Sequence, residues 1–431
     1  MIICVLPISG ETEILFFENP TVVLSRLQKQ VFENLRIQAS QTGEPVLFYE
    51  NRLYRDELNG AAVLLAEIYD LLPDTGEVIL TPCKRGLPVA GLRIKTAAYK
   101  SWVSGAVSEP TDGWIRLENV PVPLPFWAPE RTATSRGKID LTVYPSFSTY
   151  LGNYDDRFKL FFQIMPVLST TLWRGAAVYV EGAVPIYNDV NYQFYRFKEY
   201  AQISKAAVSQ MARLPGDIYA ATAVGIFNPN RWGISGEAVK LFWNRQIMIG
   251  CRFEYTGFCL YYKNVWNYTP LNRFGLLTGQ VYAIGRITPL NLQVSVSYNR
   301  YVMKDRGPLF EVSRNFGENS VGVFAGDTKI DKFGGIYIKF PLARKKMAQP
   351  TLFRATLPRQ YEYSYRATNF VYTQHAPIQT GISVYSGTRL PYLFNQLTPN
   401  YLHHNRHLFL KAHQEKSSGL RHEEIPESLW Q

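Results

Sequence analysis

The sequence predicts a mainly β protein: an antiparallel up-and-down transmembrane β-barrel of about 12 strands that follows a small N-terminal α/β domain. Three observations predict it. Residues 138–341 alternate apolar and polar side chains, the connections between these strands alternate in length, and ionisable residues fall opposite the apolar stripes. Side chains alternate across a strand with period two, so this pattern gives each strand one apolar and one polar face.

Residues 10–104 are predicted to form the small α/β domain, which we expect to be periplasmic. VLFYE (46–50) and EVILTP (77–82) are strand-like, whereas residues 22–38 and 56–72 have helix-like composition. Residues 105–137 are predicted to be a linker, because the prolines of VPVPLP cannot donate ladder hydrogen bonds.

The first nine residues, MIICVLPIS, are apolar and precede the polar GETE. They resemble the end of a signal-peptide apolar region without its basic start, so we expect a truncated signal peptide whose true start lies upstream. The alternative is a short buried strand. Mass spectrometry of the mature N-terminus distinguishes the two.

Twelve strands are predicted between residues 138 and 341, because this region shows period-two alternation and no helical period. They cover 138–146, 157–169, 176–186, 201–212, 217–227, 235–243, 246–258, 279–287, 290–300, 308–316, 319–326 and 333–341.

The connections between these strands are short and long in turn. WRG, RLPG, NR, TP and GEN are short, and the intervening loops are longer and richer in aromatic and charged residues. Alternate connections of an up-and-down sheet lie at the same end. The asymmetry is therefore typical of outer-membrane barrels, which have short periplasmic turns and longer extracellular loops.

A soluble sandwich or water-soluble barrel would also show period two. Strand length favours a membrane, because about ten residues tilted by about 45° rise roughly 23 Å, near the apolar band of about 25 Å. Aromatic residues also gather near strand ends, as interfacial girdles require: Tyr144, Trp173, Trp243, Tyr298 and Phe340.

The polar faces supply the candidate functional residues, which we expect to line the lumen. They are Arg157, Lys159, Glu181, Arg252, Glu254, Asn291, Gln293, Asn299 and Lys339. The basic members would attract an anionic glycan, or they would simply form ion pairs that fill a narrow barrel. Two positions depart from the pattern, since Lys205 shares a face with Ile203 and Arg314 shares one with Phe310. In the strand 290–300, Val294→Arg should impair assembly and Ser295→Arg should be tolerated.

No catalytic residue, cofactor or metal is predicted. The chain has no GxGxxG, GxxxxGK[ST], GxSxG or HExxH motif. The adjacent Asp155 and Asp156 point apart on a loop. His403 and His407 have metal-ligand spacing for a helix, although an exposed basic tail explains them better. Cys251 and Cys259 are either disulfide-bonded or free, because spacing does not decide between them.

The net charge of +11 has two readings, a basic tail with solvated loops or an anionic partner. No dense basic run with interleaved aromatics indicates nucleic acid. Residues 342–431 are predicted to be a tail or accessory region, partly disordered near its end. Within this tail, YEYSYRA, NFVYTQ and TGISVYS are candidate strands. FGGIYIKF (333–340) resembles a terminal barrel strand, so the barrel closes there or tail strands extend it.

Two runs, IDLTVYPSFSTYLGNYDDRFKLFFQIMPVLSTTLWRGAAVYVEGAVPIYND (139–189) and RLPGDIYAATAVGIFNPNRWGISGEAVKLFWNRQIMIG (213–250), resemble the YjbH/GfcD-type family of exopolysaccharide and group 4 capsule secretion proteins. FYENRLYRDELNGAAVLLAEIYDLL and TPCKRGLPVAGLRI resemble that family's N-terminal α/β domain. The resemblance spans residues 45–340. Longer relatives are expected to carry two barrels, and this chain has room for one.

The resemblance implies a non-enzymatic barrel in the outer membrane of a Gram-negative bacterium, involved in export or surface organisation of exopolysaccharide or capsule. Its expected partners are outer-membrane lipid, an anionic polysaccharide and other proteins of the secretion apparatus. Two alternatives remain. One is a structural or glycan-binding outer-membrane protein with a closed barrel, and the other is an outer-membrane enzyme, which no motif favours.

Overall fold

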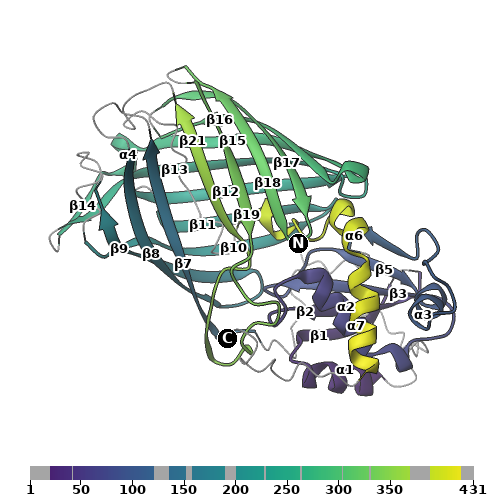
Figure 1. Cartoon of the computed structure of the whole chain (residues 1–431). Coiled ribbons are helices and arrows are strands. Elements are labelled where there is room, and N and C mark those ends of the chain that lie inside the picture. The colour runs from purple at the N-terminus through teal and green to yellow at the C-terminus, as the bar shows by residue number, and fades with distance from the viewer. Residues whose placement is uncertain are drawn as a thin grey trace, which may run out of the picture.

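The computed structural model contains two sheets, a small one in an α/β domain and a large curved one beside it (Figure 1). The structure describes residues 20–418 except 41, 121–134, 152–157, 190–199, 228–229, 263–264, 303, 330–331 and 369–388. The N-terminal nine residues of the sequence, Asp155 and Asp156 therefore lie outside the described residues.

The α/β domain contains a sheet of order β1-β2-β3-β5-β6, with β4 paired to β3. Its strands are β1 (Glu33–Ala39), β2 (Pro45–Glu50), β3 (Glu77–Lys84), β4 (Leu87–Pro88), β5 (Gly91–Lys95) and β6 (Ile115–Glu118). Its helices are α1 (Pro20–Lys29), α2 (Glu57–Glu67), the 3₁₀ turn η1 (Tyr69–Leu71) and α3 (Thr96–Val103). The helix-like composition of residues 22–38 was misleading beyond Lys29, because Glu33–Ala39 pairs with β2 as a strand.

Helix α2 connects the parallel strands β2 and β3, which makes a βαβ unit. Asp56 begins the helix, since its carboxylate accepts a hydrogen bond of 2.8 Å from the Asn59 N–H. Most of the helix is buried, including Leu58, Leu64 and Leu65.

Within the described residues, the large sheet has fifteen strands and is antiparallel except where β20 meets β7. Its strands are β7 (Ile139–Leu151), β8 (Phe158–Thr171), β9 (Ala176–Asn188), β10 (Gln202–Leu214), β11 (Ile218–Phe227), β12 (Arg231–Phe242), β13 (Ile247–Tyr262), β14 (Val265–Tyr268), β15 (Leu276–Ile287), β16 (Leu292–Arg300), β17 (Arg306–Phe316), β18 (Asn319–Asp327), β19 (Lys332–Phe340), β20 (Phe353–Thr356) and β21 (Tyr361–Thr368). Short helices, α4 (Leu271–Phe274) and the 3₁₀ turn η3 (Thr288–Leu290), lie in two of its connections.

All twelve predicted strands are present, as β7–β13 and β15–β19, and neighbours in sequence pair with each other. The candidate tail strand YEYSYRA is also confirmed, because it forms most of β21, which pairs with β19. Tail strands therefore extend the sheet beyond FGGIYIKF. NFVYTQ and TGISVYS lie outside the described residues.

The two edges of the large sheet approach each other. β20 pairs with β7 and β21 pairs with β19, although only residues 357–360 separate β20 from β21 in sequence. Nearer the C-terminal end of β7, the Thr149 hydroxyl lies 3.1 Å from the Tyr363 hydroxyl on β21. Within the described part of the chain no backbone ladder joins β21 to β7, so the predicted closed barrel is not confirmed.

The short connections of the large sheet face the α/β domain (Figure 1). The Gly175 N–H in the β8–β9 turn donates to the Arg85 carbonyl (2.8 Å), and Arg245 in the β12–β13 turn donates to the Val89 carbonyl (2.8 Å). Arg55 binds Glu318 in the β17–β18 turn through two nitrogens, at 2.7 and 2.5 Å. The α/β domain is therefore attached at the short-turn end.

The chain ends in helices α5 (Leu390–Leu393), α6 (Pro399–Asn405) and α7 (His407–Ser417). Residues 389–418 are not an exposed polar tail, because this segment returns to the α/β domain and α7 lies along α2 (Figure 1). The disorder predicted near the end of the tail concerns residues outside the described part of the chain. Phe409 is fully buried there, edge-on to Trp114 with ring centroids 5.5 Å apart. The predicted boundary at residue 104 therefore divides this domain's core from one of its own helices.

Candidate functional site

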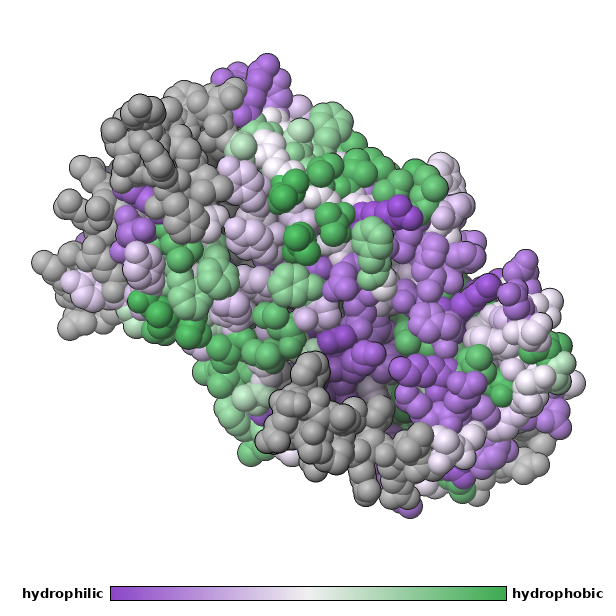
Figure 2. All heavy atoms as spheres, viewed as in Figure 1, coloured by the Kyte–Doolittle hydropathy of each residue, from purple (hydrophilic) through white to green (hydrophobic). Residues whose placement is uncertain are grey.

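Alternate side chains of the large sheet divide into an exposed face and a buried face, which we call the inner face. On β16, Val296 and Tyr298 are 42% and 55% exposed, whereas Ser295, Ser297 and Asn299 are buried. The inner face is polar even though it is buried. The opposite face is apolar even though it is exposed, and Figure 2 shows such side chains over the sheet.

The exposed apolar side chains run across most of the width of the sheet, from β8 to β19. They include Ile164, Leu168, Val184, Ile203, Val208, Val224, Ile234, Ile249, Phe253, Val281, Val296, Phe310, Val312, Val321, Val323, Ile336 and Ile338. Monomeric soluble proteins rarely expose apolar patches of more than a few hundred Å². An exposed apolar face of this extent is therefore unusual for a soluble monomer.

Lys205 lies on the inner face although Ile203, two residues earlier, is half exposed. The ladder between β9 and β10 shifts register between these two residues, and a β-bulge moves the following side chains to the other face. Lys205 then forms an ion pair of 2.6 Å with Glu181, which also accepts a hydrogen bond of 2.9 Å from the Tyr144 hydroxyl. The bulge explains this departure from period two.

Arg314 stays on the exposed face with Phe310 and Val312. It lies near the end of β17, and its guanidinium lies 5.4 Å from the centre of the Phe316 ring. A long side chain at a strand end can bring its charge to the edge of an apolar band.

A second group of inner-face charges comes from β12, β13 and β15. Arg252 and Glu254 form an ion pair of 2.7 Å. The Thr278 hydroxyl donates to Glu254 at 3.1 Å, and the Tyr282 hydroxyl donates to Glu237 at 3.1 Å. Tyr282 can reach across because its strand partner is Gly250, where a Cβ would lie 2.5 Å from the ring.

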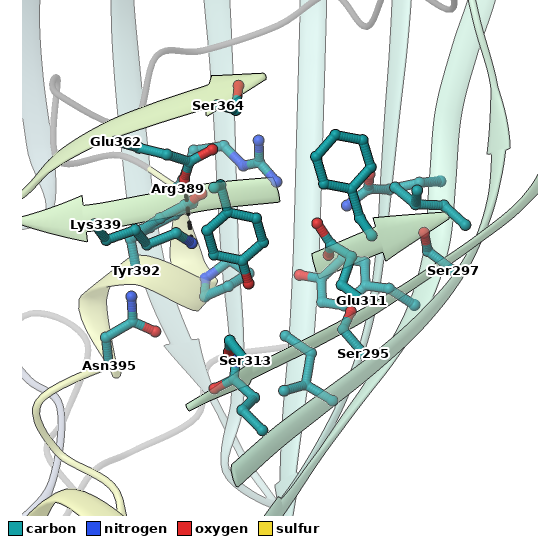
Figure 3. A pocket seen from close by; sticks show the side chains of 18 of the residues that line it. Ser295, Ser297, Glu311, Ser313, Lys339, Glu362, Ser364, Arg389, Tyr392 and Asn395 are labelled. Atoms are coloured by element: carbon teal, nitrogen blue, oxygen red, sulfur yellow. Dashed lines mark ion pairs between the residues drawn. The ribbon is translucent and has the colours of Figure 1, made fainter. Parts of the chain in front are cut away.

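A cavity of about 270 Å³ lies on the inner face between β15–β19, β21 and α5. Figure 3 shows Lys339, Glu362, Arg389 and Tyr392 on one side, with Ser295, Ser297 and Glu311 opposite. Lys339 forms an ion pair of 3.1 Å with Glu362 and lies 5.2 Å from the centre of the Tyr392 ring. The lining therefore offers charges of both signs and several hydroxyl groups, which suits binding of polyols and sugars.

Helix α5 forms one wall of this cavity and is fixed to the sheet. The Leu390 N–H donates to Glu237 at 2.9 Å, and Arg389 lies 3.5 Å from the same carboxylate. The ring of Phe394 packs against Tyr219 and the guanidinium of Arg245, at 4.9 and 5.0 Å between centres. The C-terminal segment thus narrows the space along the inner face near the short-turn end.

A second cavity, of about 300 Å³, lies between the α/β domain and the strands β7–β9, and α5 also contributes to its wall. Asp140 on β7 accepts hydrogen bonds from Arg52 (2.8 Å) and Arg354 (2.6 Å). Glu57 accepts from Arg359 at 2.8 Å and forms an ion pair with Lys84. We call this space the interdomain cavity.

A family model described as exopolysaccharide biosynthesis protein, YjbH, matches residues 18–356. The match covers most of the chain. The chain belongs to the YjbH family. Among curated proteins, none matches it. None of the helices that the structure describes is long and apolar enough to cross a membrane.

In this YjbH-family chain, the predicted lumen residues have the following places. Glu181, Arg252, Glu254 and Asn299 are buried on the inner face, Lys159 is half-buried, and Gln293 and Lys339 line the 270 Å³ cavity. Arg157 lies outside the described residues. Asn291 is buried in the turn that precedes β16, where it has a left-handed backbone (φ 52°) and donates to the Asn315 carbonyl. Asn is among the residues that most readily adopt this conformation. The place of Asn291 in the lumen stays a prediction.

The other candidate groups do not form a site in the described residues. His403 and His407 are exposed and belong to different helices, and no described cluster of three His, Cys, Asp or Glu side chains could hold a metal ion. Cys251 and Cys259 are free thiols, one exposed and one buried. The alternative of a disulfide between them is therefore excluded.

Sequence analysis missed Glu237, Glu311, Glu362 and Arg389 as inner-face residues. Glu237 and Glu311 each alternate with apolar neighbours, which was a usable signal. Glu362 and Arg389 lie in the part of the chain that was treated as a tail, and only the pairing of β21 with β19 places them beside Lys339.

Proposed function

We propose that this YjbH-family chain is a non-enzymatic outer-membrane protein involved in export or surface organisation of exopolysaccharide, with its α/β domain in the periplasm. The observation that carries the proposal is the apolar exposed face of a large curved sheet whose inner face is polar and ion-paired. The family supports the link to exopolysaccharide.

Lipid is the partner that fits this face best. Only helices and closed sheets satisfy their backbone groups within a bilayer, and the approaching edges of the sheet, β7 and β21, are positioned for such closure. The ring would consist of thirteen strands, namely β7–β13, β15–β19 and β21. Because neighbouring strands alternate in direction, the first and the thirteenth, β7 and β21, run in the same direction. Closure would therefore be parallel there, with β20 already paired to β7 in parallel.

The attachment of the α/β domain supports the orientation. Outer-membrane barrels place short turns in the periplasm, and the short turns of this sheet contact the α/β domain. We therefore assign the longer loops to the cell surface.

Membrane fractionation with heat-modifiable gel mobility tests the proposal. We expect the protein in the outer-membrane fraction, with faster migration when unheated, because a closed barrel resists unfolding by detergent. A protein that remains in the soluble fraction and shows no mobility shift would contradict it.

A second candidate is a glycan-binding outer-membrane protein that opens no pore. The observation favouring it is α5, whose attachment to Glu237 narrows the inner space. Conductance in planar bilayers separates the two. The Glu237→Gln variant weakens the attachment of Arg389 to the sheet. If the protein exports polysaccharide, this variant should have a higher probability of the open channel than Glu254→Gln, which is the control at another buried inner-face residue. No conductance from either variant would favour the second candidate.

A further inference from the structure

Among the described residues, more basic than acidic side chains line the interdomain cavity. Six basic side chains line it: Arg52, Lys84, Arg85, Lys138, Arg354 and Arg359. Four carboxylates contact these groups or the Arg85–Gly86 backbone, namely Glu33, Glu50, Glu57 and Asp140. Among the residues that the structure describes, these six cations and four anions leave a surplus of two positive charges at neutral pH.

Part of the surplus lies at Glu57, whose single carboxylate is shared by two cations, Lys84 and Arg359. The side chain of Glu57 is only 4% exposed. Burial lowers the pKa of Lys84 and of Arg359, and the Glu57 carboxylate opposes this only partly. These shifts have the sign expected where two buried cations share one anion.

An acceptor without a partner lies beside these cations. Glu57 uses Oε1 for both Lys84 and Arg359. Its other oxygen, Oε2, is buried and has no hydrogen-bond partner among the described residues. Buried polar atoms normally have partners, so this oxygen suits a hydroxyl donor on a ligand.

We propose that the interdomain cavity binds an acidic sugar residue of a polysaccharide, whose carboxylate contacts Lys84 and Arg359 and whose hydroxyl donates to Glu57 Oε2. The inference deepens the proposed function and rests on it for the choice of a sugar. A volume of about 300 Å³ lies at the lower end of ligand pockets. Guanidinium groups bind carboxylates through paired hydrogen bonds.

The position of the cavity fits a site that an acidic chain would meet on the way to the inner face. Tyr392 and Asn395 of the α5 segment line both the interdomain cavity and the 270 Å³ cavity. Among the described residues, these two side chains therefore lie between the two spaces. A sugar bound on the α/β-domain side lies next to the polar interior of the sheet.

Calorimetric titration of the purified full chain in detergent tests the site. The probe is trigalacturonic acid, with maltotriose as the neutral probe of equal length. The variants are Arg359→Gln and Lys84→Gln, and the matched control is Arg116→Gln, an exposed cation of the same domain that does not line the cavity. Thermal unfolding of each variant verifies that it folds. If a glutamine variant does not fold, Arg359→Lys is used in its place.

We expect the acidic trimer to bind and the neutral trimer not to bind. Each cavity variant should weaken binding about tenfold, since one charge-assisted hydrogen bond is lost. Arg359→Lys should weaken it less, and Arg116→Gln should leave it unchanged. Equal affinity of Arg359→Gln and Arg116→Gln, or no binding at all, overturns the proposal.

Inorganic phosphate serves as a further probe. If phosphate binds and loses affinity in the cavity variants while the acidic trimer does not bind, the site takes a small anion and the sugar proposal is wrong. The outcome is independent of membrane location. A soluble protein in fractionation contradicts the outer-membrane role, whereas failed binding contradicts only this site.

Discussion

At the scale of single residues, neighbours along a strand of the large sheet lie on opposite faces and therefore have different surroundings. Val296 is 42% exposed on the apolar face, whereas Ser295, its neighbour in sequence, is buried and lines the inner cavity. Glu311 lines the same cavity and is the strand partner of Ser295, so a cation at residue 295 would have an anion nearby.

We expect Val296→Arg to impair assembly and Ser295→Arg to be tolerated. Arginine on a lipid-facing strand costs about 2–4 kcal/mol near the membrane midplane. The measurement is the fraction of heat-modifiable protein in the outer membrane for each variant. Equal yields would show that the two faces do not differ in their surroundings.

Asp56 is a buried carboxyl at the start of α2 that binds the hydroxyl of Tyr401 on α6. Burial raises its pKa to about 6, and the hydrogen bonds from Tyr401 and the Asn59 N–H oppose this only partly. The folded state therefore keeps the proton to higher pH than the unfolded chain, whose Asp loses it near 4. The stabilisation of the folded state that comes from protonated Asp56 is complete below pH 4 and is lost as pH rises through 6.

Asp56→Asn should remove this pH dependence, because Asn is an equally good N-cap and does not titrate. The wild-type free energy of unfolding should fall between pH 4 and 6 by on the order of 3 kcal/mol from this group, and the variant should lack that fall. Urea titrations followed by tryptophan fluorescence measure it. Asp112→Asn, at an exposed turn, should retain the wild-type slope.

At the scale of elements, α7 completes the core of the α/β domain. Phe409 and Ala412 are buried, and Lys416 donates to the Ala66 and Glu67 carbonyls at the end of α2, at 2.8 and 3.0 Å. The last carbonyls of α2 are thus satisfied by a residue 350 positions away.

Phe409→Ala should destabilise the α/β domain by about 3–5 kcal/mol, because it leaves a cavity against Trp114. Lys411→Ala is the matched control, since Lys411 is exposed on the same helix and its pair with Glu415 is worth under about 1 kcal/mol. Urea midpoints measured by Trp fluorescence compare the two. A small effect of Phe409→Ala would mean that α7 is not part of the domain core.

Sequence signals account for most strands but not for α7. Period-two alternation predicted twelve strands because each has one apolar and one polar face. For the C-terminal helices, a usable signal was Thr398 followed by Pro399, an N-cap with proline at the first helical position. The apolar residues Leu402, Phe409 and Ala412 are spaced for one helical face, but three histidines between positions 403 and 407 made the segment look like a polar tail.

At the scale of the whole molecule, ion pairs join the α/β domain to the sheet. Asp140 lies on β7, Arg52 follows β2 of the α/β domain, and Arg354 lies on β20. One carboxylate thus holds two mostly buried guanidinium groups from separate parts of the chain.

Asp140→Asn should therefore cost about 3 kcal/mol or more of stability, because it leaves buried positive charge uncompensated. Asp327→Asn is the matched control, since Asp327 is 60% exposed and pairs with Lys332 at 3.6 Å. The control should cost under about 1 kcal/mol. Urea unfolding of both variants gives the comparison, and equal losses would contradict a structural role for the Asp140 pairs.

The arrangement of domain and sheet was only partly predictable. Loop lengths indicated which end carries the short turns, and the α/β domain is attached there. The clustering of charges was not predictable, because Lys205 reaches Glu181 through a bulge that no local residue pattern announces. The interdomain cavity depends on residues 50–57, 84–85, 138–142 and 354–359, which converge only after folding.

The burial of α7 against α2 has a consequence for biosynthesis. The α/β domain leaves the ribosome before the sheet, and at that stage it lacks α7, which packs on α2 and Trp114. Helix α7 is made only after the described strands of the sheet. Contacts across such a separation form slowly, because a long loop must close first. The domain made first therefore finishes last, and its uncovered apolar surface needs protection for the whole period of synthesis.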